Sequence, residues 1–301
     1  MKIKRIVFTG LFLVSVFTVA SAQIKLSFNP EKGTKYDYYQ ETLSNVKQNV
    51  MGQEIPVEME ISSKYLMEIM DKTPQEIQAQ FICQEIAYII SSPMMKMGYD
   101  SKNPIENPSD MDKLFGKMLS GMLGSSIMMV FAPDGSVKSI TGMDAIADSM
   151  TKAVATDGQI AAQMAAQVKQ QFSEASMKNL FEQTFNIYPD NPIRTGNSWN
   201  KESAIMQNNM NTAIKTKYTL KNVSRNMATV TLKSNIEMNS SAGMEGKLTG
   251  TQTGTIIVDT KTGLPVKGDM SQNIKGAVSA QGMDVQMEMV NKMKSSIKEV
   301  K

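Results

Sequence analysis

The chain has 301 residues, a formal net charge of +3, one cysteine and no histidine. The absence of histidine excludes Ser-His-Asp and Cys-His nucleophile systems, the usual zinc sites and a histidine-based pH switch. The single cysteine, Cys83, excludes an intrachain disulfide. Because Cys83 directly follows Phe81 and Ile82, we expect it to be a buried thiol on a strand.

The first 22 residues have the pattern of a cleaved secretory signal peptide. Lys2, Lys4 and Arg5 precede an apolar run over residues 6–20, and Ala-Ser-Ala at 20–22 is a small-x-small cleavage site. The run is shorter than the ~20 residues of a spanning helix, so we expect cleavage after Ala22. Cleavage removes three cations and leaves 29 Lys and Arg against 29 Asp and Glu. We therefore expect a periplasmic or secreted protein with no transmembrane segment and no nucleic-acid partner, since phosphate binding needs clustered cations.

Residues 23–142 are predicted to form a first β-rich half. Between Val57 and Ile69, apolar side chains alternate with charged ones such as Glu58, which assigns the two sets to opposite faces of a sheet. One apolar and one hydrated face is typical of antiparallel sheets. Turn signals at 51–53 and 133–135 predict hairpin connections.

Methionine is the outstanding compositional bias, with 27 residues, many of them between residues 94 and 129. Apolar residues with a helical period predict a short amphipathic helix over residues 112–123, beginning near Ser109 and Asp110. Three interpretations of the methionines stay open. They fill the core in place of leucine, they line a soft cavity, or their thioethers bind Cu(I). The copper candidates are Met94, Met95, Met97, Met287 and Met289.

The cavity interpretation provides the candidate ligand site. A short helix loosened by Gly116 and Gly121 suits a lid over one face of a curved sheet. Unbranched, polarizable methionine side chains repack around varied apolar ligands such as a lipid, an acyl chain or an apolar peptide. The predicted ligand-binding residues are Met94, Met95, Met97, Leu114, Phe115, Met118, Leu119, Met122 and Met128. We predict neither a cofactor nor a metal site.

Residues 143–199 are predicted to form a helical segment followed by a structured loop. Residues 143–150 and 159–185 are rich in Ala, Gln, Lys and Met. The apolar residues with helical spacing are Ile160, Met164, Val168, Phe172, Leu180, Phe181 and Phe185. The loop at 188–199 contains two prolines and the only tryptophan, Trp199, which we expect to pack against the core.

Residues 200–301 are predicted to form a second β-rich half. Apolar residues again alternate with polar ones over 228–238 and 283–297. Turn signals at 259–263 and 281–282 separate the strands.

Short segments of the first half reappear in the second half at a constant spacing. Asn45-Val46-Lys47 is echoed by Asn273-Ile274-Lys275, and 273 − 45 is 228. Residues 57–61 are echoed by residues 285–289, and 285 − 57 is also 228. We interpret the chain as two related β-rich halves, although short amphipathic strands also resemble one another by chance.

No arrangement of residues predicts an enzyme. Ser-x-x-Lys, which could supply a nucleophile without histidine, occurs in three unrelated contexts, beginning at Ser44, Ser149 and Ser295. The acidic residues alternate along predicted strands, and nothing in the sequence brings two of them to the separation that glycoside cleavage needs. There is no Gly-rich phosphate loop before a helix.

Short motifs along the chain carry a resemblance to a known family. They are Met51-Gly52-Gln53, Tyr99-Asp100-Ser101, Asp134-Gly135-x-Val137 with Gly142, Pro189 with Pro192 before Gly196-Asn-Ser-Trp199, and Asp259 with Thr262-Gly263. On these residues the chain resembles an uncharacterised family of secreted proteins of about this length from Bacteroides-type bacteria, although Asn197 stands where that family has Asp. More distantly, the predicted fold is similar to the half-barrel carriers of lipoproteins and lipids in the periplasm. That likeness implies a fold and transfers no site residue.

The sequence as a whole predicts an α+β protein with an extensive curved antiparallel β-sheet, built from two related β-rich halves with a helical segment between them. The leading functional hypothesis is a non-catalytic envelope protein that binds an apolar ligand in a Met-lined cavity under the 112–123 helix. One alternative is a structural or protein-interaction module with an envelope protein as partner. The other is a hydrolase that works without histidine.

Overall fold

The structure is a computed structural model. It describes residues 23–50, 52–154, 163, 166, 173–207, 210–240, 245–280 and 283–301. The predicted signal peptide lies outside the described residues. So do Met51, the turn at 281–282, and the predicted helical positions Ile160, Met164, Val168 and Phe172.

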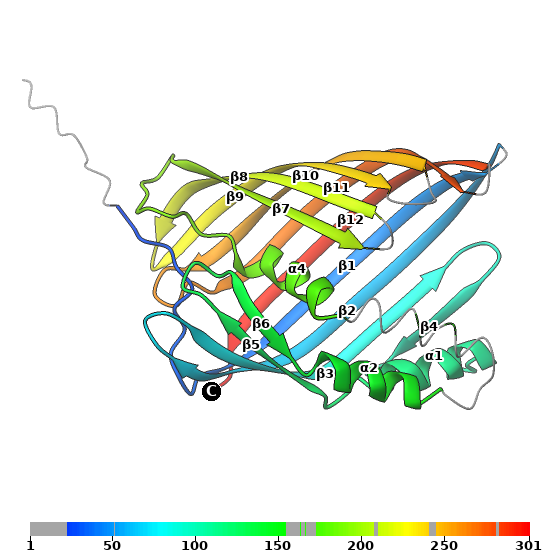
Figure 1. Cartoon of the computed structure of the whole chain (residues 1–301), viewed down its shortest axis with the longest axis horizontal. Helices are drawn as coiled ribbons and strands as arrows, with labels where there is room; N and C mark the ends of the chain where they lie inside the picture. The colour runs from blue at the N-terminus through cyan, green and yellow to red at the C-terminus, as the bar shows by residue number, and fades with distance from the viewer. Residues whose placement is uncertain are drawn as a thin grey trace, which may run out of the picture.

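The described residues form one antiparallel sheet of 12 strands (Figure 1). The strands are β1 (Lys35–Val50), β2 (Gln53–Lys72), β3 (Ile77–Ser91), β4 (Lys96–Asp100), β5 (Ser126–Phe131), β6 (Val137–Thr141), β7 (Ser198–Gln207), β8 (Met210–Ser224), β9 (Met227–Ser240), β10 (Glu245–Asp259), β11 (Pro265–Ala280) and β12 (Met283–Glu299). The predicted turn at 133–135 lies between β5 and β6, and the one at 259–263 begins at the last residue of β10 and precedes β11. The predicted α+β fold with a large curved antiparallel sheet is therefore confirmed.

The order of strands joins the two predicted halves into a single sheet. The order is β6-β5-β3-β2-β1-β12-β11-β10-β9-β8-β7, with β4 paired to β3. The first and last strands of the chain, β1 and β12, pair at the centre of the sheet. The edge strands are β6 and β7, which precede and follow the helical segment in the chain. The echoed residues do not pair equivalently, because Val46 faces Val57 while Ile274 faces Met289. That the halves are related stays a prediction.

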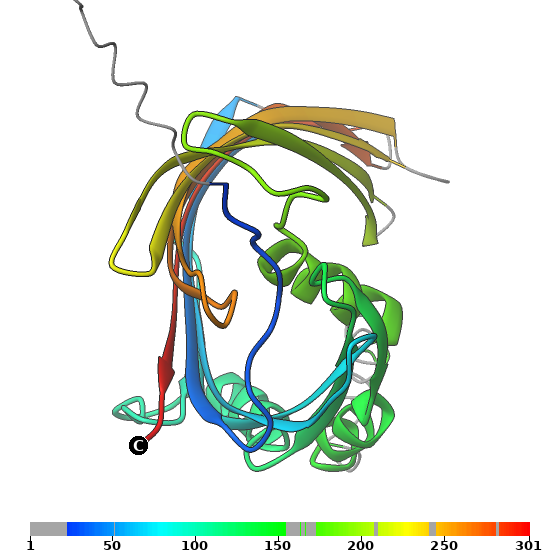
Figure 2. The ribbon, with the colours of Figure 1, turned by 90° about the vertical axis from the view of Figure 1, so that its left-hand side faces the viewer.

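The sheet is strongly curved, and its concave face carries the apolar residues. Figure 2 shows the strands following one continuous curve, with β7 and β6 at its two ends. The alternation predicted for residues 57–69 is realised in β2, where Tyr65 and Met67 are buried while Glu58 and Glu60 are exposed on the other face. A period of two therefore assigned the faces correctly.

Helices α1 (Asp110–Ser120), α2 (Met143–Lys152) and α4 (Glu174–Phe185) pack on the concave side. The ring of Phe115 in α1 lies 5.3 Å from that of Tyr88 in β3, and α4 contacts both edge strands, β6 and β7. In the described part of the chain, no helix combines the length and hydropathy needed to cross a membrane.

The main core is a set of stacked and edge-to-face aromatic rings centred on Phe185. Its ring centroid lies 5.5 Å from Phe28, 5.2 Å from Phe131 and 5.9 Å from Tyr38. Phe28 belongs to an N-terminal segment that crosses the concave side of the sheet at one end (Figure 2). The Phe28 N–H donates to the carbonyl of Pro133 at 2.9 Å, so the segment is fixed to the β5–β6 turn. This end of the concave face is therefore filled.

Gly135, in the same turn, is needed for close packing against the end of α4. Its φ is +78°, and a Cβ atom there would overlap the carbonyl of Phe185. Only glycine adopts this positive φ and leaves room for the Phe185 carbonyl without strain. The turn predicted at 133–135 thereby also positions α4.

Replacing Ser109 with alanine should destabilise the protein by about 1 kcal/mol through loss of a helix cap. The Ser109 hydroxyl accepts the Asp112 N–H at 3.1 Å, and the Asp112 carboxylate accepts the Ser109 N–H at 2.8 Å. The hydrogen bond from the Ser109 side chain is the main cause that lowers the pKa of Asp112. The predicted helix start near Ser109 is confirmed by this capping box.

Acidification should reduce the contribution of this cap. Because the folded pKa of Asp112 is lowered, its stabilisation is complete above the unfolded pKa and is lost as the pH falls through the folded value. Thermal melts of Asp112→Asn should differ from wild type at neutral pH and converge as the pH falls below the ordinary carboxyl value of about 3.9. The exposed neighbour variant Asp110→Asn is the control. An equal Asp112→Asn penalty at neutral and at acidic pH would contradict this account.

Cys83 should not react with a thiol reagent in the folded protein. It lies in β3, is only 3% exposed, and burial raises its pKa to about 11 from the usual 9.0. The thiolate population is then about a hundredfold lower than for a free thiol, and the reagent also lacks access. Labelling with an aromatic disulfide should be complete only after denaturant is added. Rapid labelling without denaturant would show that this part of the core opens.

Candidate functional site

A continuous row of polar side chains crosses the concave face from β7 to β1. Each member is the cross-strand partner of the next: Lys201, Thr216, Ser234, Gln252, Gln272, Asn291 and Ser44. We call this set the polar row. Two hydrogen bonds join neighbouring members of the row, Thr216 with Ser234 at 2.8 Å and the Asn291 amide with Gln272 at 2.6 Å. A third holds the Gln252 amide against the sulfur of Met270 at 3.1 Å.

A second apolar cluster, separate from the main core, lies beyond the polar row. It is at the end of the sheet where β7 joins β8, β9 joins β10 and β11 joins β12. Its buried members are Ile214, Ile236, Leu248 and Ile274, and the half-buried ones are Ile205, Met210, Met238, Val278, Met287 and Met289. We call these ten residues the apolar end. They come from six strands, β7 to β12, and no helical residue of the described ranges belongs to the cluster. The concave face thus carries two apolar regions with a polar row between them.

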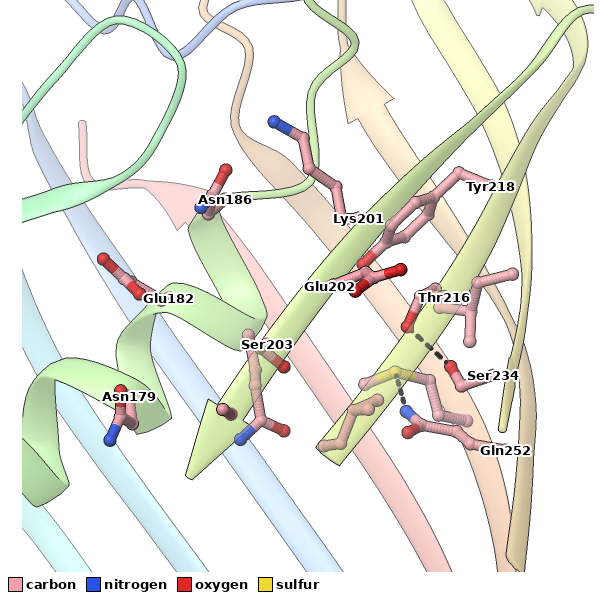
Figure 3. Close-up of a pocket in the computed structure, with 15 residues that line it drawn as sticks. Asn179, Glu182, Asn186, Lys201, Glu202, Ser203, Thr216, Tyr218, Ser234 and Gln252 are labelled. Carbon is pink, nitrogen blue, oxygen red and sulfur yellow. Dashed lines mark hydrogen bonds between the residues drawn. The ribbon is translucent and has the colours of Figure 1, made fainter. Parts of the chain in front are cut away.

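A cavity of about 220 Å³ lies between α4 and the concave face of β7–β11 (Figure 3). From α4 and its end come Asn179, Glu182, Gln183 and Asn186. From the polar row come Lys201, Thr216, Ser234 and Gln252, and the apolar lining includes Ile214, Leu232 and Met270. Ile214 belongs to both the cavity and the apolar end, so the two are continuous.

Two buried amide oxygens in this region have no hydrogen-bond partner. They are Oδ1 of Asn186, which lines the cavity, and Oδ1 of Asn291 in the polar row. Asn291 is 8% exposed. A buried acceptor without a donor costs free energy comparable to a lost hydrogen bond, and it marks a place where a donor is missing.

The predicted packing of Trp199 against the core is confirmed, and its stacking partner Tyr218 lines the cavity. Its indole stacks on Tyr218 at 5.5 Å between centroids, and its Nε1 donates to the carbonyl of Ile187 at 2.9 Å. Burial raises the pKa of Tyr218 to about 12, partly offset by a hydrogen bond with Thr216. Tyr218 therefore presents a neutral hydroxyl group to the cavity at physiological pH.

The structure does not show the predicted Met-lined cavity under the 112–123 helix. Phe115, Met118, Leu119 and Met122 are between 5% and 8% exposed and pack in the main core. They fill space between α1, α2 and the sheet because the residues facing them are large and apolar. At these four positions the core-filling interpretation is correct.

The remaining predicted residues are scattered. Met94 and Met95 are 80% and 48% exposed at the tip of the β3–β4 hairpin. Leu114 and Met97 are half-buried against the main core. Met128 lies on the face of β5 opposite to that of the core residues on either side of it. The prediction that Met94 and Met95 line a cavity was wrong, because both stand on a solvent-exposed turn.

Sequence reasoning missed the polar row and the cavity. Thr216, Ser234 and Gln252 look unremarkable in the sequence, since each is one small or polar residue within an alternating strand. Their alignment depends on the registers of separate strand pairs. Met287 and Met289 were noticed, as candidate copper ligands, and both belong to the apolar end. The described residues contain no group of three or more His, Cys, Asp or Glu that could hold a metal.

Comparison with solved structures gives only distant similarity. The chain is similar to a structure of lipovitellin described for its lipid–protein interactions, at 11% identity and a TM-score of 0.45, over 89% of this chain and 26% of the lipovitellin chain. It thus spans about a quarter of that protein. The Pseudomonas aeruginosa protein OccK7 (OpdD) has 7% identity and a TM-score of 0.25, over 89% of this chain and 100% of its own. An outer membrane channel from Pseudomonas putida F1 has 8% identity and a TM-score of 0.23, with coverages of 89% and 96%.

No curated protein sequence matches the chain. A family model does match, over residues 75–265, which is well over half of the chain and spans β3 to the start of β11. The expected membership in an uncharacterised family is thereby confirmed, while the Bacteroides-type origin stays a prediction. The chain belongs to DUF6263, a family of unknown function.

Proposed function

We propose that this protein is a non-catalytic binding protein of the periplasm or cell exterior that holds the apolar chain of a lipid-like molecule on its concave face. The tail lies against the apolar end. The site therefore differs in place from the cavity that the sequence suggested, although its ligand class is the same.

The observation that carries the proposal is the separation of the apolar end from the main core. Ten apolar side chains converge on the concave side of six strands, and no described helix contributes to the cluster. Four of the ten are methionines, whose flexible thioether chains adapt to varied apolar ligands. A contiguous apolar surface of this kind, bordered by polar residues, is typical of a binding site.

The dimensions suit an extended chain. Thr216 of the polar row and Met210 at the end of β8 are six residues apart (216 − 210), or about 20 Å of strand at ~3.4 Å per residue. Each buried methylene group contributes about 0.8 kcal/mol, so about ten of them offset the costs of association.

The test is native mass spectrometry of the exported protein, followed by organic extraction and lipid analysis. The proposal expects an apolar molecule bound at near one-to-one stoichiometry. A ligand-free mass that stays unchanged after incubation with envelope lipids would overturn it. Pull-down from envelope extract would then test the protein-partner alternative.

A further inference from the structure

We propose that the cavity beside α4 holds the head of the bound amphiphile, and that this head is an uncharged polyol such as the glycerol of a monoacylglycerol. The inference rests on the proposed function and adds the chemical class of the ligand. It starts from the position of the cavity, which meets the apolar end at Ile214. A molecule whose tail covers the apolar end places its head in the cavity.

The first argument is the hydrogen-bonding capacity of the sheet wall. Thr216 and Ser234 lie side by side and share one hydrogen bond of 2.8 Å, which uses one of their two hydroxyl protons (Figure 3). The neighbouring Gln252 amide donates to the sulfur of Met270, a weak acceptor. These groups offer both donors and acceptors to a ligand, and hydroxyl groups satisfy both.

The second argument is an unpartnered acceptor. Oδ1 of Asn186, which lines the cavity, is buried and receives no hydrogen bond from the described residues. A bound head that carries O–H donors would satisfy this oxygen. A carboxylate or a phosphate diester offers acceptors only and would leave it unpaired.

The third argument is charge. Glu182 and Glu202 line the cavity with a single cation, Lys201. Lys201 lies 3.4 Å from Asp190, and Glu202 lies at 4.0 Å from Lys215. Glu182 Oε1 also accepts the Val137 N–H at 3.2 Å, and the Glu202 side chain is 71% exposed, so neither carboxylate is aimed at the sheet wall of the cavity. The cation of the described lining is thus already paired with Asp190, and an anionic head would find no counter-ion there, whereas an uncharged head needs none.

The size of the cavity agrees with such a head. Its volume of about 220 Å³ far exceeds the ~10–15 Å³ that one buried water needs on the same measure. A head of several non-hydrogen atoms fits there, and the waters that it displaces have hydrogen bonds which hydroxyl groups can replace.

The experiment compares two probes with the same tail, monolauroylglycerol and laurate, by calorimetric titration of the purified protein at about pH 8. We expect monolauroylglycerol to bind at least about tenfold more tightly, since laurate places a carboxylate in a cavity whose cation, Lys201, is already paired with Asp190. If laurate binds as tightly or more tightly, the head-group inference is overturned while the proposed function stands. If neither probe binds, the proposed function fails as well.

Two matched double variants test whether the concave face binds the head group of the ligand. Thr216→Val with Ser234→Ala removes both partners of the buried hydroxyl pair, a change that is nearly neutral for stability. We expect it to weaken monolauroylglycerol about tenfold and to leave laurate unchanged.

The control is the equivalent pair on the convex face. Ser198 and Thr219 share a 2.9 Å hydrogen bond on β7 and β8 but are exposed. Ser198→Ala with Thr219→Val should affect neither probe. An equal loss for both probes in the first variant, or a loss in the control, would overturn the inference. The comparison of probes on the wild-type protein decides the question even if a variant fails to fold.

Discussion

Replacing Met238 and Met289 with glutamate should release the bound apolar chain, lowering its affinity by about a hundredfold or more. Both side chains are half-buried members of the apolar end, on β9 and β12. Full burial of such a side chain against a ligand contributes about 1.5–3 kcal/mol, and every 1.4 kcal/mol changes affinity tenfold. The introduced carboxylates also lose hydration when a ligand covers them, which adds to the effect. Titration with a fluorescent fatty-acid analogue measures the change.

The chain offers a control with the same two charges on the same two strands. Asn239 and Gln286 each adjoin a member of the apolar end, but they are exposed and point to the convex face. Asn239→Glu with Gln286→Glu should therefore bind the analogue as the wild type does. If both double variants bind normally, the ligand does not lie against the apolar end. If both lose binding equally, the effect is one of overall charge.

Replacing Phe185 with alanine should reduce the free energy of unfolding by about 3–5 kcal/mol. Phe185 is fully buried at the end of α4, and its ring contacts the rings of Phe28, Phe81 and Phe131. These neighbours come from the N-terminal segment and from β3 and β5. The surrounding aromatic rings are held by separate elements, so the space left by the deletion cannot collapse fully. Urea denaturation followed by tryptophan fluorescence measures the loss.

The matched control is another apolar residue of the same helix. Leu180 in α4 is 47% exposed, so Leu180→Ala should change stability by no more than about 0.5 kcal/mol. Similar small losses in both variants would show that α4 is not anchored in the core. Because α4 positions Glu182 and Asn186, Phe185→Ala should also weaken binding of monolauroylglycerol.

The local pattern of the sequence was sufficient for the elements themselves. Alternation with a period of two predicted which residues of β2, β9 and β12 share a face, since that periodicity is a property of any extended chain. The start of α1 was predicted at Ser109, where a side chain within one turn caps the helix. The buried state of Cys83 and the packing of Trp199 followed in the same way, from their immediate neighbours.

The candidate site depended on information that no local pattern contains. Ser44 and Asn291 are partners in the polar row although most of the chain separates them, and the pairing of β1 with β12 brings them together. Alternation tells which face an apolar residue occupies, but not whether a helix covers that part of the face. Met118 and Met289 are both methionines in amphipathic segments, yet one fills the main core and the other lies at the apolar end.

Local patterns in the sequence were therefore enough to predict the strands, helices α1, α2 and α4, the two faces of the sheet, and the exclusion of histidine-based and disulfide chemistry. Strand pairing over long distances in the chain sets which apolar residues form a cluster to which no helix of the described residues belongs, and which polar residues stand in one row. Periodicity acts over a few residues, whereas the register and curvature of a sheet with 12 strands depend on pairings between distant segments.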